Sequence, residues 1–264
     1  MKKLALALSA VGALVGTSAL AWAADMAVKA PPPAPSAPAY NWTGFYVGGQ
    51  GGGGWFDNNV TNGAVVLGTG TNFPPGLVHS PEHGSGGLGG IYGGYNYQIN
   101  QFVVGIDGDY SWASLTGSSS TLGVPVAATG CTVAPCITND TDKIKWIATV
   151  TGRLGYAANN WLLFAKAGWA GAGFNGTESN FGNAGANTAN GTNSSTRNGW
   201  TIGTGAEYGF APHWSAKLEY DYVQFSSTSY NSTFISTTTG ATSIFGRNAS
   251  SDINLVKAGI AYRF

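Results

Sequence analysis

Apolar and polar residues alternate along the last thirteen residues of the chain, Asp252 to Phe264. One row is apolar and the other is small or charged: Val256, Ala258, Ile260, Tyr262 and Phe264 against Lys257, Gly259, Ala261 and Arg263. A period of two is typical of a β-strand whose two faces meet different surroundings. Other segments repeat the pattern with large aromatic residues in the apolar row. We therefore expect a closed barrel with a lipid-facing outside and a polar inside, closed by pairing of the last strand with the first.

The composition favours strands over helices as the elements that cross the membrane. Charged residues make up 9% of the chain, against about 25% in a typical soluble protein, and aromatic residues make up 12%. Mean hydropathy is nevertheless close to zero, at +0.01, because alternating apolar and polar positions cancel. Beyond the N-terminal region no apolar run reaches the roughly 20 residues of a membrane helix. The net charge of zero gives no indication of a nucleic-acid partner.

The N-terminal region predicts export. A basic start, Met1-Lys2-Lys3, precedes the apolar stretch 4–20 and the A-x-A motif Ala21-Trp22-Ala23, which is the pattern of a signal peptide covering residues 1–23. A retained anchoring helix is the alternative. Residues 24–41 are rich in proline, which keeps a chain extended and outside a β-ladder, so we expect a periplasmic tether, with a partner-binding segment as the alternative. The barrel would then span residues 42–264, in the outer membrane of a Gram-negative bacterium.

Eight alternating segments predict an all-β fold, an eight-stranded antiparallel up-and-down transmembrane β-barrel. The expected strands are residues 42–56, 86–99, 102–115, 142–156, 161–174, 197–210, 213–225 and 252–264. Each is longer than the roughly 9–11 residues that a tilted strand needs to cross the hydrocarbon layer. Long polar connections follow the odd-numbered segments and short turns follow the even-numbered ones. This asymmetry predicts long extracellular loops and tight periplasmic turns, with Trp and Tyr near the strand ends, Trp42 among them, at the membrane interfaces.

The charged residues test these registers, because a Lys or Arg on the lipid face at mid-bilayer costs about 2–4 kcal/mol. The expected lumen charge network consists of Asp107, Asp109, Lys143, Lys145, Arg153, Lys166, Glu207, Lys217, Glu219 and Asp221, with Arg197, Lys257 and Arg263 on the same face. Asp142 and Asp252 are expected on the outer face at the extracellular rim. Phe164 is expected inside, against the general pattern.

The interior of an eight-stranded barrel is just wide enough for side chains to fill it, so we expect cross-strand ion pairs. Two interpretations of this network stay open. In the first, which we favour, it is a plug that holds a structural surface barrel closed. In the second, it lines a narrow conduit of a small-pore, porin-like transport protein.

The connections hold three smaller features. Cys131 and Cys136 are the two cysteines and predict a loop disulfide in an exported protein. His79 and His83 flank Glu82 closely enough to be weak candidates for a metal or haem site, although we favour the simpler interpretation that they are solvated loop residues. We expect no bound metal and no cofactor. We also expect no enzymatic activity, because the sequence offers no paired nucleophile and base at the barrel rim.

Both ends of the mature chain carry a family resemblance. The segments N-W-T-G-F-Y-V-G-G (41–49) and G-I-A-Y-R-F (259–264) resemble the outer-membrane surface-antigen barrels of alphaproteobacteria. That family shares the eight-stranded plan of the outer membrane protein A transmembrane domain. The segment 23–33 is similar to the family's mature N-terminus.

The resemblance implies an abundant surface protein that supports envelope integrity among outer-membrane lipid and lipopolysaccharide. Some relatives are described as porin-like and others as haem-binding, so a haem or host ligand at the loops is a third interpretation. Phe264 resembles the terminal aromatic residue that the barrel-assembly machinery recognises. The resemblance supplies no catalytic residue, and Cys131 and Cys136 have no counterpart in the family pattern.

Overall fold

A computed structural model describes residues 40–67, 82–123, 136–181, 187–236 and 242–264. The expected signal peptide, the tether up to residue 39, His79 and Cys131 lie outside these ranges, as does the side chain of Cys136. The signal peptide, the tether and the disulfide therefore stay predictions. Within the described ranges there is no helix both long enough and apolar enough to cross a membrane.

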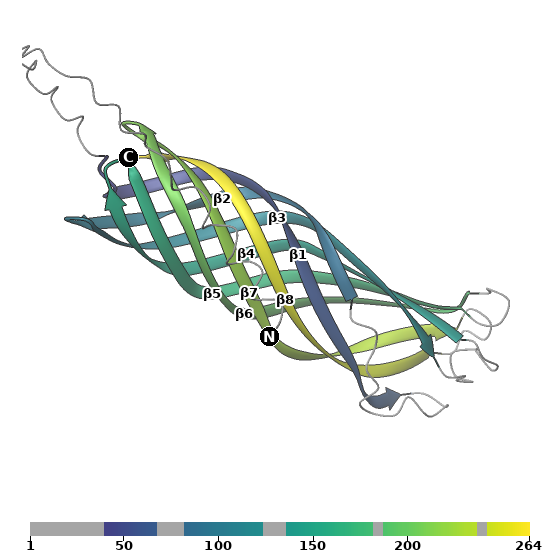
Figure 1. The fold of residues 1–264 in the computed structure, drawn as a ribbon. Helices are drawn as coiled ribbons and strands as arrows, with labels where there is room; N and C mark the ends of the chain where they lie inside the picture. The colour runs from purple at the N-terminus through teal and green to yellow at the C-terminus, as the bar shows by residue number, and fades with distance from the viewer. Residues whose placement is uncertain (1–39, 68–81, 124–135, 182–186, 237–241) are drawn as a thin grey trace, which may run out of the picture. The chain divides into compact units, whose positions relative to one another are not determined.

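Eight antiparallel strands form one closed ring. They are β1 (Gly44–Leu67), β2 (Glu82–Ile99), β3 (Phe102–Gly123), β4 (Cys136–Ala158), β5 (Trp161–Phe181), β6 (Asn187–Ala211), β7 (Trp214–Ser236) and β8 (Thr242–Arg263). Each strand pairs with the next, and β8 pairs with β1, so that the yellow last strand lies beside the purple first strand in Figure 1. The expected eight-stranded antiparallel barrel is confirmed.

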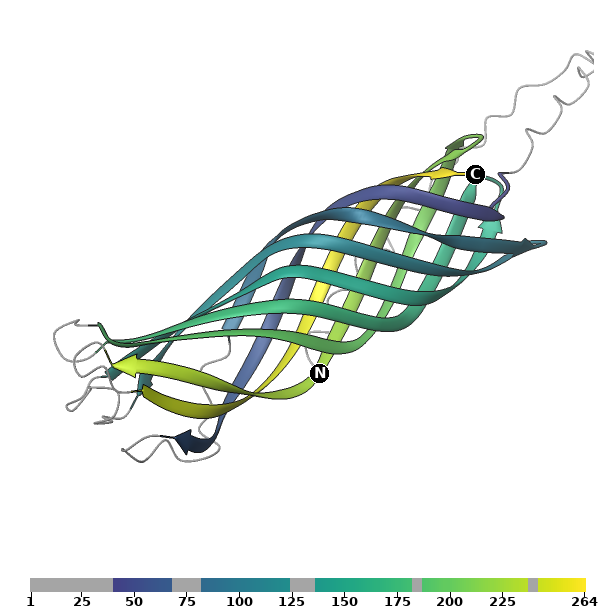
Figure 2. The same cartoon turned by 180° about the vertical axis from the view of Figure 1, so that it is seen from behind.

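Three tight turns lie at the end of the barrel that also holds the C-terminus. They join β2 to β3, β4 to β5 and β6 to β7, and Figure 2 shows the same barrel from behind. Asn100 and Asn159 begin two of these turns with φ of 55° and 53°, a region that asparagine tolerates better than most residues. We call this end the turn end, and the opposite end the loop end.

The strands continue much further toward the loop end than expected. Pairing of β5 with β6 extends to Phe181 and Asn187, and only residues 182–186 connect the two strands. The prediction of long loops was therefore wrong for much of these connections. The outer parts of the strands are rich in Ser, Thr, Asn and Gly and have no row of apolar residues. No lipid surrounds this part of the barrel, so no apolar face is needed, but the backbones of neighbouring strands still pair.

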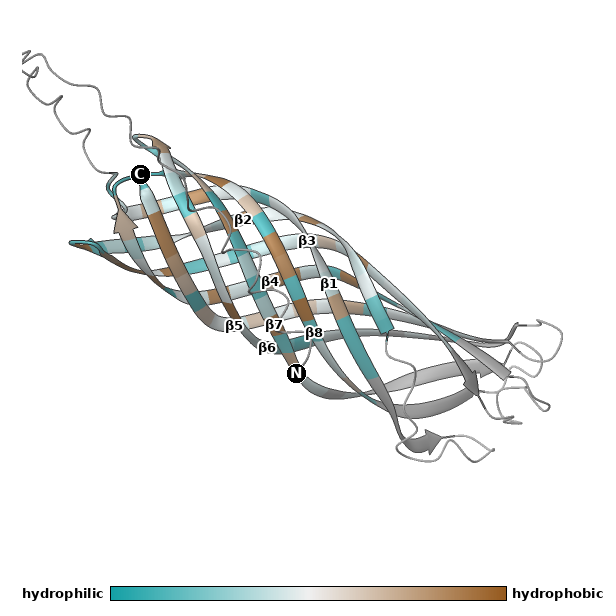
Figure 3. Ribbon diagram, in the orientation of Figure 1, coloured by the Kyte–Doolittle hydropathy of each residue, from teal (hydrophilic) through white to brown (hydrophobic). Residues whose placement is uncertain are grey.

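The outer face of the barrel is apolar. Large exposed side chains include Phe45, Ile106, Val150, Leu154, Leu163, Ile202, Leu218 and Ile260, each at least half exposed. Figure 3 shows brown apolar residues alternating with teal polar ones along the strands. Aromatic pairs border this face toward the turn end, such as Trp161 with Tyr208 at 4.7 Å between ring centroids, and toward the loop end, such as Tyr110 with Trp112 at 5.3 Å. This arrangement is that of a barrel surface between two membrane interfaces.

Side chains fill the lumen in four layers along the barrel. The aromatic cap at the turn end is Tyr40, Trp42, Val103, Ala157 and Leu162. The ionic core is Asp107, Asp109, Arg153, Lys166, Glu207, Lys217, Glu219, Asp221, Lys257 and Arg263. The apolar layer is Phe56, Leu88, Leu115, Ile144, Ile147, Ala170, Ala172, Phe174, Val223, Phe225, Ile253 and Leu255. The polar cluster toward the loop end is Asn58, Glu82, Asp142, Arg197 and Ser251.

Trp42 was expected at a membrane interface, and this prediction was wrong. Its side chain is fully buried in the aromatic cap, and its ring is 4.5 Å from that of Tyr40. Its backbone N–H donates to Gln98 Oε1 at 2.9 Å, and its carbonyl accepts from Arg263 Nη1 at 2.7 Å. Trp42 therefore closes the lumen at the turn end.

Candidate functional site

Two lysines occupy the centre of the ionic core. Lys257 Nζ lies 2.7 Å from Asp221 Oδ2, 2.9 Å from Glu219 Oε1 and 3.1 Å from Asp109 Oδ2. Lys166 Nζ contacts the same three carboxylates at 3.1–3.8 Å. Four strands supply these groups across the lumen, because alternation places every second residue of β3, β5, β7 and β8 inside the ring.

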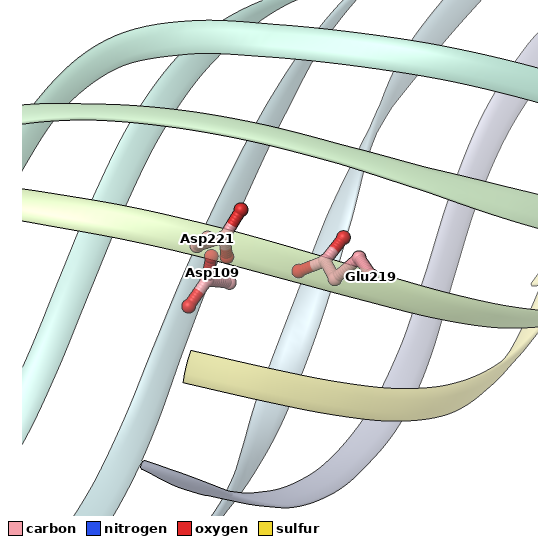
Figure 4. Close-up of side chains that lie close together, drawn as sticks. All are labelled: Asp109, Glu219 and Asp221. Carbon is pink, nitrogen blue, oxygen red and sulfur yellow. The ribbon is translucent and has the colours of Figure 1, made fainter. Parts of the chain in front are cut away.

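Asp109, Glu219 and Asp221 also satisfy the spacing of a cation site. Their ligand atoms lie within 4.8 Å of one another, and Figure 4 shows the three carboxylates gathered inside the barrel. The ammonium groups of Lys166 and Lys257 already contact all three carboxylates. The lysines therefore supply the positive charge that a metal ion would otherwise bring.

A second centre surrounds Glu207, closer to the turn end. Its carboxylate accepts from Arg153 Nη2 at 2.5 Å, from Ser215 Oγ at 2.6 Å and from Arg263 Nη2 at 3.4 Å. The guanidinium of Arg153 lies 3.7 Å from the ring centroid of Phe164. This contact explains why a phenylalanine faces the lumen, since an arginine that stacks on an aromatic ring keeps its edge free for a carboxylate.

Tyrosines from the first two strands complete the ionic core. Tyr46 donates through its hydroxyl to Asp107 Oδ2 at 2.6 Å, and Lys217 Nζ lies 3.6 Å from the ring centroid of Tyr92. Lys217 also donates to Glu219 at 3.0 Å. Strands β1 and β2 carry glycines rather than charges in much of this region, so their contribution to the network comes through these rings.

The ionic core holds five carboxylates and five basic groups, and none of the ten residues is more than 6% exposed. A buried charge without a partner costs several kcal/mol, whereas a well-paired set of buried charges comes close to balance. Such a network adds little net stability over an apolar core, but it penalises any strand register that would separate the partners.

Lys143 and Lys145 do not join this network. Both side chains are exposed, whereas Ile144 is fully buried in the apolar layer. The cause is a β-bulge in β4. Ile144 pairs with Phe174 of β5. The next residue of β5 in the ladder, Gly173, pairs with Trp146, so β4 has one extra residue at this point. One extra residue reverses the alternation, so Asp142, expected outside, is also buried.

His83 lies on the outer face, with an exposed ring that contacts the carboxylate of Asp57. Since His79 is outside the described residues, the metal or haem site remains untested. Asp252 is partly exposed on the outer face, next to Asp57 in the register of β1 and β8. The C-terminal Phe264 is 73% exposed, and its backbone N–H donates to the carbonyl of Phe45 at 2.9 Å.

Two parts of the lumen were not predicted from the sequence. The apolar layer was missed because Leu115, Ile144, Phe174 and Phe225 stand near the ends of the expected strands, where the choice between inside and outside is weakest. The polar cluster was missed because Glu82 was assigned to a loop. For Phe225 the sequence did contain a signal. It lies an even number of positions from Glu219 and Asp221, so a regular strand places all three side chains on the inner face.

A closed eight-stranded ring with an apolar outside and a charged inside is the plan of an outer-membrane barrel, and comparison with known families gives the same result. The family model for the outer membrane protein beta-barrel domain matches residues 9–264. The chain belongs to this family. The protein is therefore an outer-membrane β-barrel of a Gram-negative bacterium, and outer-membrane lipid surrounds it.

Two named proteins are similar to this chain over most of its length. The 31 kDa outer-membrane immunogenic protein of Brucella melitensis biotype 1 is 31% identical over 231 residues, which cover 82% of this chain and 85% of that protein. The 22 kDa outer membrane protein of Rhizobium leguminosarum bv. viciae is 28% identical over 231 residues, 88% of this chain and 82% of its own length.

Among solved structures, the outer membrane protease OmpT from Escherichia coli has a TM-score of 0.48 at 8% sequence identity and covers 87% of this chain and 99% of its own. The outer membrane protein OprG from Pseudomonas aeruginosa has a TM-score of 0.44, also at 8% identity, and covers 85% of this chain and 99% of its own.

Proposed function

We propose that this outer-membrane barrel is a structural surface protein that supports envelope integrity and does not conduct ions or solutes. The observation that carries the proposal is the filled lumen. Along the barrel the aromatic cap, the ionic core and the apolar layer follow one another, and each is made of buried side chains. A diffusion pore needs a continuous water-filled path, as in larger barrels.

The apolar layer is the strongest part of this argument. Phe174 and Phe225 reach toward each other from β5 and β7, on either side of β6, with ring centroids 5.5 Å apart, and both are no more than 2% exposed. An ion that crossed this layer would lose its hydration without gaining a polar partner, which is prohibitive. The charged residues below the layer would then serve as a plug rather than as the lining of a conduit.

In this proposal the loop end of the barrel is the part that other molecules recognise, and the membrane-spanning part anchors it in the outer membrane. One of the two relatives named above, from Brucella melitensis, carries the word immunogenic in its name, which supports an antigenic role for the loop end here. The proposal includes no catalytic activity. Haem or host-ligand binding remains a separate prediction, because His79 lies outside the described residues.

Planar-bilayer recording on the refolded full-length protein tests the proposal. We expect no steady conductance steps at protein amounts for which an open porin, reconstituted in the same way, gives steps. Insertion is verified by the mobility of the unboiled protein on an electrophoretic gel. Steps of reproducible size that increase in number with the amount of folded protein would instead establish the small-pore, porin-like alternative.

A further inference from the structure

The polar cluster is a second buried group of charges, separated from the ionic core by the apolar layer. Its members come from β1, β2, β4, β6 and β8, and each is no more than 8% exposed: Asn58, Glu82, Asp142, Arg197 and Ser251. It lies on the loop side of Trp55, Trp112 and Trp200, which are exposed on the outer face. Exposed tryptophans of this kind mark the membrane interface, so the polar cluster lies outside the hydrocarbon layer. The proposed function makes no use of it.

Hydrogen bonds join the two carboxyl groups to the rest of the cluster. The backbone N–H of Asp142 donates to Glu82 Oε1 at 2.8 Å, and Asn58 Nδ2 donates to Asp142 Oδ2. Arg197 Nη1 donates to Ser251 Oγ at 2.6 Å and to Asn58 Oδ1 at 3.3 Å. The bond from the Asp142 backbone holds the Glu82 carboxyl beside Asp142, and both residues are buried. Two carboxyl groups held close together in a buried site repel each other when both are ionised, so a proton on one of them is favourable.

A glycine makes this meeting possible. Glu82 is on β2 and Asp142 on β4, so the intervening strand β3 lies between them. The β3 residue opposite Asp142 is Gly117. A Cβ atom at this position would lie 3.1 Å from Cγ of Glu82 and 2.9 Å from Cζ of Phe56. Glycine therefore leaves the space through which the Glu82 side chain passes over β3.

The charges of the polar cluster do not balance, unlike those of the ionic core. With both carboxyl groups ionised, the cluster holds two negative charges and the single positive charge of Arg197. Asp140 on β4 adds negative potential at Asp142. Among the other titratable residues that the structure describes nearby, Asp57, His83 and Asp252 are on the outward-facing side of the wall. Burial of a net negative charge is costly, and one bound proton removes it.

We propose that Glu82 and Asp142 share one proton at neutral pH, and that loss of this proton to solvent in alkaline medium loosens the loop end of the barrel. The pair is thus a proton-operated latch between β2 and β4. The inference does not depend on whether the lumen conducts.

The direction of the pH effect follows from the Glu82 carboxyl. Burial, and secondly the charge of Asp142, raise the pKa of Glu82 to about 8, and burial raises the pKa of Asp142 above its ordinary value. A carboxyl whose pKa is higher in the folded than in the unfolded state stabilises the fold fully below the unfolded value, about 4.3. This stabilisation is lost as the pH rises through the folded value. The loop end should therefore be well ordered at pH 6.5 and loosened at pH 9.

Amide hydrogen exchange on the full-length protein in detergent micelles tests the latch, with EDTA present so that no divalent cation replaces the proton. After correction for intrinsic exchange rates, we expect protection of residues 82–86 and 140–144 to fall on the order of tenfold between pH 6.5 and pH 9. Glu82→Gln and Asp142→Asn should each abolish most of this pH dependence, because either change removes the excess negative charge.

Asp252→Asn is the matched control, since Asp252 is a carboxyl at a similar height on the outer face, and it should behave as the wild type. Equal protection of the wild type at both pH values would overturn the proposal. So would a Glu82→Gln variant that loses as much protection at pH 9 as the wild type does. Peptides of the ionic core report folding of each variant, and their protection should not change with pH.

Discussion

Lys257 offers the most direct test of the ionic core. Its ammonium group contacts three buried carboxylates within 3.1 Å, and the residue is 1% exposed. Lys257→Met keeps much of the side-chain length and removes the charge. Asp221 then retains Lys166 at 3.3 Å, and the core changes from five charges of each sign to an excess of one negative charge.

The expected loss follows from breaking a buried ion pair on one side, which costs about 3–5 kcal/mol because the remaining charge stays uncompensated. Urea unfolding of the protein in phospholipid vesicles, followed by tryptophan fluorescence and by the mobility of the unboiled protein, measures this free energy. Lys143→Met is the matched control. Lys143 is exposed on the outer face of the wall, so its loss should change the free energy of unfolding by less than about 0.5 kcal/mol.

A double variant separates charge balance from simple loss of contacts. Lys257→Met with Asp221→Asn restores neutrality, so the two effects should couple by about 0.5–3 kcal/mol and the double variant should be less damaged than the sum of the single ones. The reasoning is refuted if Lys257→Met is as stable as Lys143→Met, or if the two core substitutions are strictly additive.

Two further predictions concern single positions on the wall and at the C-terminus. A Cβ at Gly52 would lie 2.0 Å from the carbonyl oxygen of Val256, whereas the nearest atom to a Cβ at Gly51 is 3.8 Å away. Gly52→Ala should therefore lower the free energy of unfolding by about 1–3 kcal/mol, and Gly51→Ala should hardly change it. Equal losses for the two variants would contradict this steric explanation. Phe264→Ala keeps the backbone bond to Phe45, so the folded barrel should unfold at the same urea concentration while less of it reaches the outer membrane in cells. Unchanged amounts in the membrane would remove Phe264 as an assembly signal.

Much of the fold could be predicted because lipid acts on every second residue. In the segments around Trp161, Tyr220 and Ile260, the apolar row marks the lipid face directly, and a shift by one residue would expose the opposite row. The same reasoning placed Asp107, Arg153 and Lys166 on the inner face, where the structure shows them buried. The number and direction of the strands followed from these rows and from the tight turns.

The bulge in β4 marks the limit of this reasoning. An alternating pattern cannot reveal one additional residue when both neighbours of the bulge are compatible with either face, and Asp142, Lys143 and Lys145 were all placed on the wrong side as a result. The outer parts of the strands were missed for a different reason. In water both faces of a strand can be polar, so Asn187 to Thr196 carry no periodic signal, and the pairing with β5 appears only in three dimensions.

The length of the strands determines how far the loop end of the barrel stands from the bilayer. β6 has 25 residues, and at about 3.3 Å per residue and a tilt of about 40° its height is roughly 60 Å, about two and a half times the apolar band of such a barrel. The part of the barrel beyond the apolar band consists of hydrogen-bonded strands rather than of flexible loops. An antibody that binds the outer ends of the paired strands would therefore meet them above the lipid headgroups, at a fixed distance from the bilayer.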